Sequence, residues 1–128
     1  MARDKIQIQL PTITNTTAVA GKEIKLQTVT QANGIELERA AECMRNTLKV
    51  TVANSANADS TVTFKKGDKY PNAMRGDVTL PVATGKTVEF TVQDPSQFTN
   101  KNGSINIDFA TGFTGTIYAT GKPTGIAQ

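Results

Sequence analysis

Short segments with apolar residues at alternate positions dominate the chain between Asn46 and Lys122. Polar residues occupy the intervening positions, and turn residues separate one segment from the next. The segments are Leu48/Val50/Val52, Val62/Phe64, Val78/Leu80/Val82, Val88/Phe90/Val92, Ile105/Ile107/Phe109 and Ile117/Ala119. Because successive side chains of a strand point to opposite faces, each segment has one apolar and one polar face. Two facing sheets bury all six, so the pattern predicts an all-β, antiparallel sandwich, Ig-like or jelly-roll-like.

The composition excludes several kinds of chemistry. The 128 residues fit one domain, and they include no histidine and a single cysteine, Cys43. A disulfide within the chain, a His/Cys zinc site and histidine acid–base catalysis are therefore excluded. We expect no enzyme, no cofactor and no metal centre, and we expect Cys43 to be a packing residue. A calcium site built from loop carboxylates stays open as an alternative.

The N-terminal third differs in character from the rest. Lys5 to Leu10 alternates as a strand, Pro11 stops it, and Thr12 to Gly21 is polar and rich in threonine. We interpret residues 1–21 as an extended arm, residues 22–122 as the sandwich and residues 123–128 as a loose tail. The arm is a candidate docking device that adds to the sheet edge of a neighbour, with four candidate residues: Lys5, Ile6, Ile8 and Leu10. The alternative is that the arm packs on its own domain.

Other local patterns predict single elements. Glu23 to Val29 alternates as a strand with Ile24 and Leu26 on one face, whereas Glu36 to Arg45 has apolar residues at helical spacing and predicts a short helix. Ala83–Lys86 predicts a hairpin turn, and Asn102-Gly103 predicts a tight turn. Asp94–Gln97 predicts a one-turn helix that points Phe98 into the core.

The formal net charge of +3 is concentrated in one segment. Between residues 65 and 75 only Asp68 opposes the basic side chains Lys65, Lys66, Lys69 and Arg75. Nucleic-acid-binding proteins usually carry broader basic clusters with interleaved aromatic residues, so we expect an exposed, solvated basic loop and no nucleic-acid partner. No apolar run has the length of a signal peptide or a membrane span, which indicates folding in a cytosol and no membrane partner.

The order of segments resembles a known family. Three stretches carry the resemblance: NTLKVTVANSANADSTVTFKKGD, GDVTLPVATGKTVEFTVQDPSQFTNKNGSINIDF and TGTIYAT. They are similar to the β-rich accessory proteins that coat the heads of tailed bacteriophages, and the resemblance covers about residues 46–122. In that group a strand ending in VxN leads through a polar loop to a TVTFKxGD strand. The N-terminal segment Glu36 to Arg45 departs from this pattern.

The resemblance implies a virion decoration protein that stabilises the capsid surface after synthesis in the host bacterial cytoplasm. Its partners would be the major capsid protein and copies of itself, with a trimer favoured. Two alternatives stay open from the sequence. One is a fibre module that binds carbohydrate or a cell surface through the loop from Lys65 to Asp77. The other is a tail or head-completion component.

Overall fold

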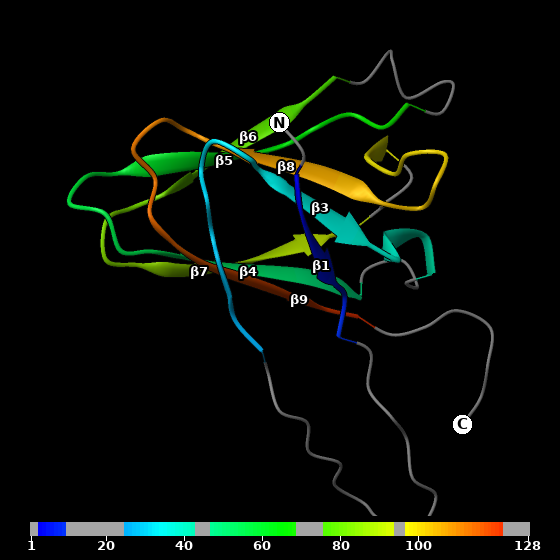
Figure 1. The fold of residues 1–128 in the computed structure, drawn as a ribbon, viewed down its shortest axis with the longest axis horizontal. Helices are drawn as coiled ribbons and strands as arrows, with labels where there is room; N and C mark the ends of the chain where they lie inside the picture. The colour runs from blue at the N-terminus through cyan, green and yellow to red at the C-terminus, as the bar shows by residue number, and fades with distance from the viewer. Residues whose placement is uncertain (1–2, 10–24, 43–46, 69–75, 94–96, 122–128) are drawn as a thin grey trace, which may run out of the picture.

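The chain folds into a two-layered β-sandwich, as the alternating segments predict. The computed structural model describes residues 3–9, 25–42, 47–68, 76–93 and 97–121. In this part of the chain the elements are β1 (Asp4–Gln7), β2 (Gln27–Thr28), β3 (Ile35–Glu38), the 3-10 helix η1 (Ala40–Glu42), β4 (Leu48–Asn54), β5 (Ser60–Phe64), β6 (Val78–Val82), β7 (Thr87–Val92), β8 (Ile105–Phe109) and β9 (Gly115–Thr120). Figure 1 shows the two layers.

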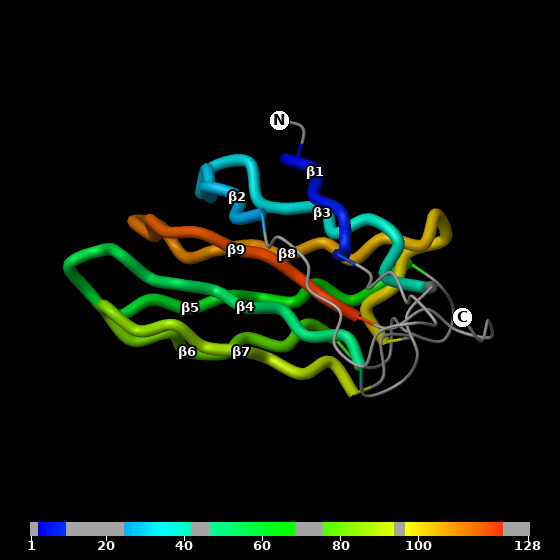
Figure 2. Tube along the Cα trace, turned by 90° about the horizontal axis from the view of Figure 1, so that it is seen from below, coloured from blue at the N-terminus to red at the C-terminus, as the bar shows by residue number. Residues whose placement is uncertain are grey.

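The strand order is that of a jelly roll. Sheet A has the order β1-β3-β8-β5-β6 and sheet B the order β2-β9-β4-β7, which Figure 2 shows with sheet B nearer the viewer. Four of the antiparallel pairs are those of one long hairpin folded at the β5–β6 connection: β5 with β6, β4 with β7, β3 with β8 and β2 with β9. Pairing of β4 with β9 and of β5 with β8 rolls this hairpin into two sheets.

The core lies between the inner faces of the two sheets. Among the described residues of the strands, the side chains with no exposed surface are Ile35, Leu37, Leu48, Val50, Val52, Val62, Val82, Ile105, Ile107, Ile117 and Ala119. Phe64 is also buried, whereas Leu80 and Phe90 are half-buried and pack against the core from the edge strands β6 and β7. The inward register predicted from the alternation is therefore confirmed, and burial is weaker at the β6/β7 side of the sandwich.

Residues 4–9 belong to the sandwich. β1 pairs in parallel with β3, and the backbone amide of Gln9 donates to the carbonyl of Ala119 at 2.8 Å. Ile6 is 8% exposed and Ile8 is 2% exposed, so neither side chain is free to fill a pocket on a neighbour. The structure thus favours the alternative in which this segment packs on its own domain, and the docking role proposed for Ile6 and Ile8 is wrong. Leu10 lies outside the described residues.

The expectation of a helix over Glu36–Arg45 is wrong for the first turn. Ile35–Glu38 is a strand, with parallel pairing to β1 on one side and antiparallel pairing to β8 on the other. Hydrogen bonding and burial on both sides override a local helix preference that was short and marginal alone. Helical geometry remains only in η1, Ala40–Glu42, and Cys43, Met44 and Arg45 lie outside the described residues.

Two other expectations need correction. The turn Ala83–Lys86 is present, with Gly85 at φ 73°, but β6 and β7 belong to different sheets, so the turn is a crossover and not a hairpin. The strand expected over Glu23–Val29 is reduced to β2 in its described part, and Leu26 is 61% exposed because the chain there pairs with β9 only over Gln27–Thr28.

Other local expectations are confirmed or fall outside the described residues. The turn at Asn102-Gly103 is present, with Gly103 at φ 88°, and Phe98 packs against the core as expected. The one-turn helix expected at Asp94–Gln97 falls largely on residues outside the described part, as does the tail 123–128.

Asn54, the asparagine of the VxN segment, joins two crossovers at one end of the sandwich. It is 2% exposed, and its Nδ2 donates to the carbonyls of Val82 at 2.9 Å and Ala58 at 3.1 Å. Its Oδ1 accepts from the amide of Ala56 at 2.9 Å. The side chain therefore holds the β4–β5 connection against the end of β6, and it satisfies backbone groups that the ladder leaves unpaired.

We predict that Asn54→Ala lowers the free energy of unfolding by about 1–3 kcal/mol, because it leaves buried backbone groups without partners. Urea unfolding of the purified protein measures this loss. Asn57→Ala, an exposed change in the same loop, is the matched control and should change stability by less than about 0.5 kcal/mol. Equal stability of the two variants would contradict the role assigned to Asn54.

We predict that Phe64→Ala costs roughly 3–5 kcal/mol of unfolding free energy, as expected for truncation of a buried aromatic ring. Phe64 is 2% exposed, and its ring centroid lies 5.9 Å from that of Phe90 and 5.8 Å from that of Phe98. Phe90→Ala should cost less, because Phe90 is half-buried at an edge strand. A larger loss for Phe90→Ala than for Phe64→Ala in the same urea titration would mean that the edge is wrongly placed.

Candidate functional site

The candidate site is an open groove on the outer face of sheet A, with a volume of about 770 Å³. Its lining is polar and charged: Arg3, Lys5, Glu36, Lys65, Lys66, Asp68, Asp77, Asn100, Lys101, Asn102, Ser104 and Asn106. These residues come from segments far apart in the sequence, between Arg3 and Asn106. We therefore treat the groove as the candidate functional site of the protein.

Strand register explains why these side chains meet. Lys5 of β1 lies opposite Glu36 of β3, and Glu36 lies opposite Asn106 of β8. The amide of Lys65, directly after β5, donates to the carbonyl of Asn106 at 2.9 Å and so extends the same row. Side chains alternate between the two faces of a strand. Because Ile6 and Leu37 point into the core, their polar neighbours Lys5 and Glu36 lie on the outer face of the sheet.

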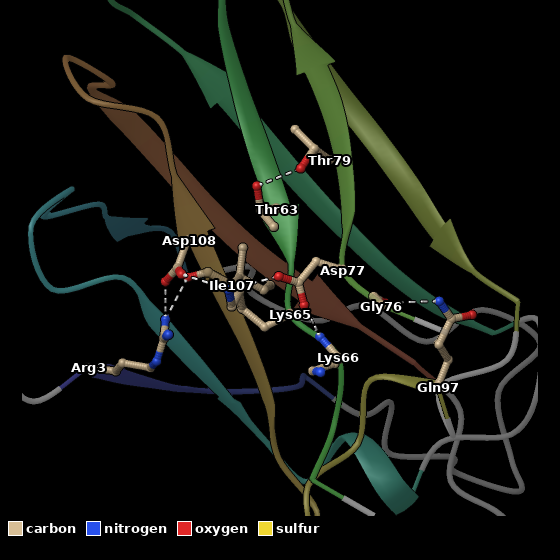
Figure 3. A network of polar contacts seen from close by, with 10 residues as sticks. All are labelled: Arg3, Thr63, Lys65, Lys66, Gly76, Asp77, Thr79, Gln97, Ile107 and Asp108. Carbon is tan, nitrogen blue, oxygen red and sulfur yellow. Dashed lines mark hydrogen bonds and ion pairs between the residues drawn. The ribbon is translucent and has the colours of Figure 1, made fainter. Parts of the chain in front are cut away.

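Ion pairs cross four strands of the sheet. Lys65 Nζ lies 2.8 Å from Asp77 Oδ2 and 4.0 Å from Asp108 Oδ2, and Asp108 also pairs with the guanidinium of Arg3 (Figure 3). Arg3 also donates to the carbonyl of Ile107 at 3.2 Å. Gly34 provides the space for this contact, since a Cβ at that position would lie 2.5 Å from the Arg3 guanidinium nitrogen.

The pair of Lys65 and Asp77 shifts both titrations. The hydrogen bond from Lys65, followed by one from the amide of Lys66 at 2.7 Å, lowers the pKa of Asp77 below its ordinary value. The hydrogen bond to Asp77 in turn raises the pKa of Lys65, against a smaller opposing effect of desolvation. Both side chains are about one third exposed, 37% for Lys65 and 34% for Asp77, so solvent screens the attraction.

The other carboxylates around the groove are also engaged. Asp68 Oδ1 accepts from the amide of Lys101 at 2.6 Å, while the amide of Asp68 donates to Asn100 Oδ1 at 3.2 Å. Glu36 accepts from Asn102 Nδ2 at 3.2 Å. The contacts around Asp68 fasten the segment after β5 to the loop before β8. The groove is thus a firmly held polar surface whose carboxylates already have donors.

The structure brings together residues from two separate sequence hypotheses. Lys5 was a candidate of the docking arm, and Lys65 and Lys66 were candidates of the exposed basic loop; all three line the groove. Lys65 forms ion pairs with Asp77 and Asp108, whereas the sequence predicts a solvated basic loop here. Lys69 and Arg75 lie outside the described residues. Sequence reasoning missed Arg3 and Lys101, because no local pattern reveals that they line the same groove as Lys65.

The described residues offer no ligand set for a metal. No group of three or more His, Cys, Asp or Glu side chains gathers among them in a way that could hold an ion. The calcium alternative finds no support there. Likewise, no helix within the described ranges is long and apolar enough to cross a membrane.

No protein-family model, no curated protein and no solved structure matches the chain. The function must therefore be argued from the fold, the groove and the sequence itself.

We predict that Lys65→Met raises the pKa of Asp77, because the hydrogen bond that contributes most to the lowered value is lost. The value should stay below the ordinary one, since the amide of Lys66 still donates to Asp77. A carboxyl ¹³C NMR titration measures the change. Lys86→Met, in the remote β6–β7 turn, should leave the pKa of Asp77 unchanged.

The same shift fixes a pH dependence of stability. The pKa of Asp77 is lower in the folded than in the unfolded chain. Its contribution to the free energy of unfolding is therefore fully present above pH 3.8 and is lost as the pH falls through the lowered pKa. Asp77→Asn should remove this part of the acid dependence. An unchanged pKa of Asp77 in Lys65→Met would contradict the pairing described here.

Proposed function

We propose that the protein is a non-enzymatic structural protein of a phage virion, which decorates and stabilises the outer surface of the capsid by binding the major capsid protein lattice. The proposal includes assembly of copies on the lattice, with a trimer favoured. A repeated lattice turns many modest contacts into tight overall attachment, so no single high-affinity pocket is needed.

Two features of the fold support this proposal. The stretch that resembles head-decoration proteins, residues 46–122, corresponds to β4–β9, which are six of the eight strands of the jelly roll. Jelly rolls recur in viral capsid and lectin domains. This second argument is an analogy at the level of the fold, and on its own it fits a lectin equally well.

The single observation that carries a binding role is the state of the carboxylates around the groove. Asp77 and Asp108 are each bonded to basic side chains, and Asp68 accepts from a backbone amide. A general base needs a carboxylate with a pKa near the working pH and access to the proton it removes. The cationic donors lower the pKa of Asp77 and stabilise its charged form, which suits a fixed docking surface better than proton transfer.

Surface composition argues against the fibre module. Sugar-binding surfaces commonly stack ligands on exposed aromatic rings, and among the described residues the exposed large hydrophobic side chain is Leu26, not an aromatic one. Tyr118 is half-buried on the outer face of sheet B. Among the residues that the structure describes, none that lines the groove is aromatic.

Fractionation of virions of the phage that encodes the chain tests the proposal. Heads without tails, isolated tails and complete virions are compared by quantitative mass spectrometry. A decoration protein should be present in the tailless heads, in a fixed ratio to the major capsid protein, and cryo-electron microscopy should show it on the outer surface with the symmetry of its oligomer.

Heads that lack the protein provide the functional half of this test. They should lose DNA at a lower temperature, and added protein should restore the wild-type temperature, because a ligand that binds the assembled lattice stabilises it. Presence in the tail fraction alone would favour the tail component. Absence from all virion fractions would overturn the proposal.

A further inference from the structure

We propose that the groove on sheet A docks an acidic surface segment of the protein partner, through the free ammonium groups of Lys5, Lys66 and Lys101. The inference rests on the proposed function, under which the partner is the major capsid protein. It adds the face of the sandwich that makes the contact and the chemistry that the partner must present.

The first argument is the distribution of unused hydrogen-bond donors. Arg3 and Lys65 are bonded to Asp108 and Asp77 within the chain. By contrast, Lys5, Lys66 and Lys101 line the groove, are exposed, and make no side-chain hydrogen bond or ion pair with the part of the chain that the structure describes. Each ammonium offers three donors and no acceptor. The groove therefore presents vacant cationic donors, while its acids are already engaged, and a carboxylate is the complementary group.

The second argument is that the backbone carrying these donors is held in place. Lys66 and Lys101 are far apart in the sequence, but they lie on two segments that hydrogen bonds join. The amide of Gly67 donates to the carbonyl of Gln97 at 3.0 Å, and Lys101 donates its own amide to Asp68 at 2.6 Å. Lys5 is fixed by the pairing of β1 with β3. A surface that is already ordered loses less entropy on binding.

The third argument selects an acidic protein segment over a nucleic acid. Acids alternate with bases around the groove, with Glu36, Asp68 and Asp77 among the lining residues. A nucleic-acid backbone carries negative charge at every phosphate and would meet these carboxylates, whereas protein segments can place single acids opposite the free lysines. Within the described part of the chain, the groove also has no aromatic ring on which bases could stack.

The opposite outer face shows the contrast. On sheet B, Lys49 lies 4.0 Å from Glu89, and most of the remaining positions of that face are threonines such as Thr91 and Thr120. Charge complementarity for an acidic partner is thus concentrated on sheet A among the described residues.

A triple variant tests the inference. Lys5→Gln, Lys66→Gln and Lys101→Gln are combined, and the matched control combines Lys25→Gln, Lys49→Gln and Lys86→Gln, which lose the same charge outside the groove. Binding of fluorescently labelled protein to heads that lack it is followed by sedimentation at 50 to 300 mM NaCl. We expect about tenfold weaker binding and a shallower salt dependence for the groove variant, from three exposed ionic contacts, and wild-type binding for the control.

A second probe separates this inference from the proposed function. A synthetic decaglutamate peptide and a DNA duplex are titrated into ¹⁵N-labelled protein, and amide NMR shifts are recorded, which also show that both variants are folded. The peptide should shift amides of residues 65–68 and 100–106 in the wild type and the control, but not in the groove variant, and it should bind more tightly than the duplex.

The outcomes are distinct. Wild-type binding of the groove variant to heads would overturn the inference and leave the proposed function standing. Peptide binding in the groove without any binding to heads would overturn the proposed function alone. Tighter binding of the duplex, or peptide shifts away from the groove, would overturn the acidic-segment inference.

Discussion

Strands β4 and β5 each pair on both of their edges, and the rest of the structure depends on this. β4 bonds to β7 and β9, and β5 bonds to β6 and β8. Without the β4–β9 and β5–β8 pairs the chain would be one long antiparallel ribbon with its apolar side open to water. Rolling the ribbon closes that side on itself, which is how a chain of this length buries a continuous core. The backbones come so close here that a Cβ on Gly115 would lie 1.8 Å from the carbonyl oxygen of Ala53.

The same rolling builds the groove. It places β1 and β3 beside β8, and β8 beside β5, so polar residues from both ends of the chain share one face of sheet A. The ion pair of Arg3 with Asp108 joins positions 105 residues apart. Once formed, the network ties four strands together on their solvent side, while the apolar side chains tie them on the inner side. The same network therefore holds the backbone beneath the surface proposed to dock a partner.

The sequence predicted part of this site. Lys65 and Lys66 stood out as a basic run, and Lys5 stood out at the start of the chain, but nothing local indicated that they would share a groove. Arg3 and Lys101 could not be found, because their place depends on which strands become neighbours. The parallel pairing that places Lys5 opposite Glu36 leaves no periodic pattern in the sequence. Each of the two residues, taken alone, has the sequence pattern of an ordinary exposed position.

The sequence by itself determined that the chain is a β-sandwich, where β4 to β9 lie, and which of their residues face inward. Alternation is a local property, because the two faces of a strand follow from backbone geometry alone. The turn at Asn102-Gly103 is also local, because it depends on the positive φ that Gly103 adopts. Only the tertiary structure decided that Ile35–Glu38 is a strand, that the Ala83–Lys86 turn crosses between sheets, and that Ile6 joins the core. These outcomes depend on pairing partners distant in the sequence, where hydrogen bonds and burial outweigh weak local preferences.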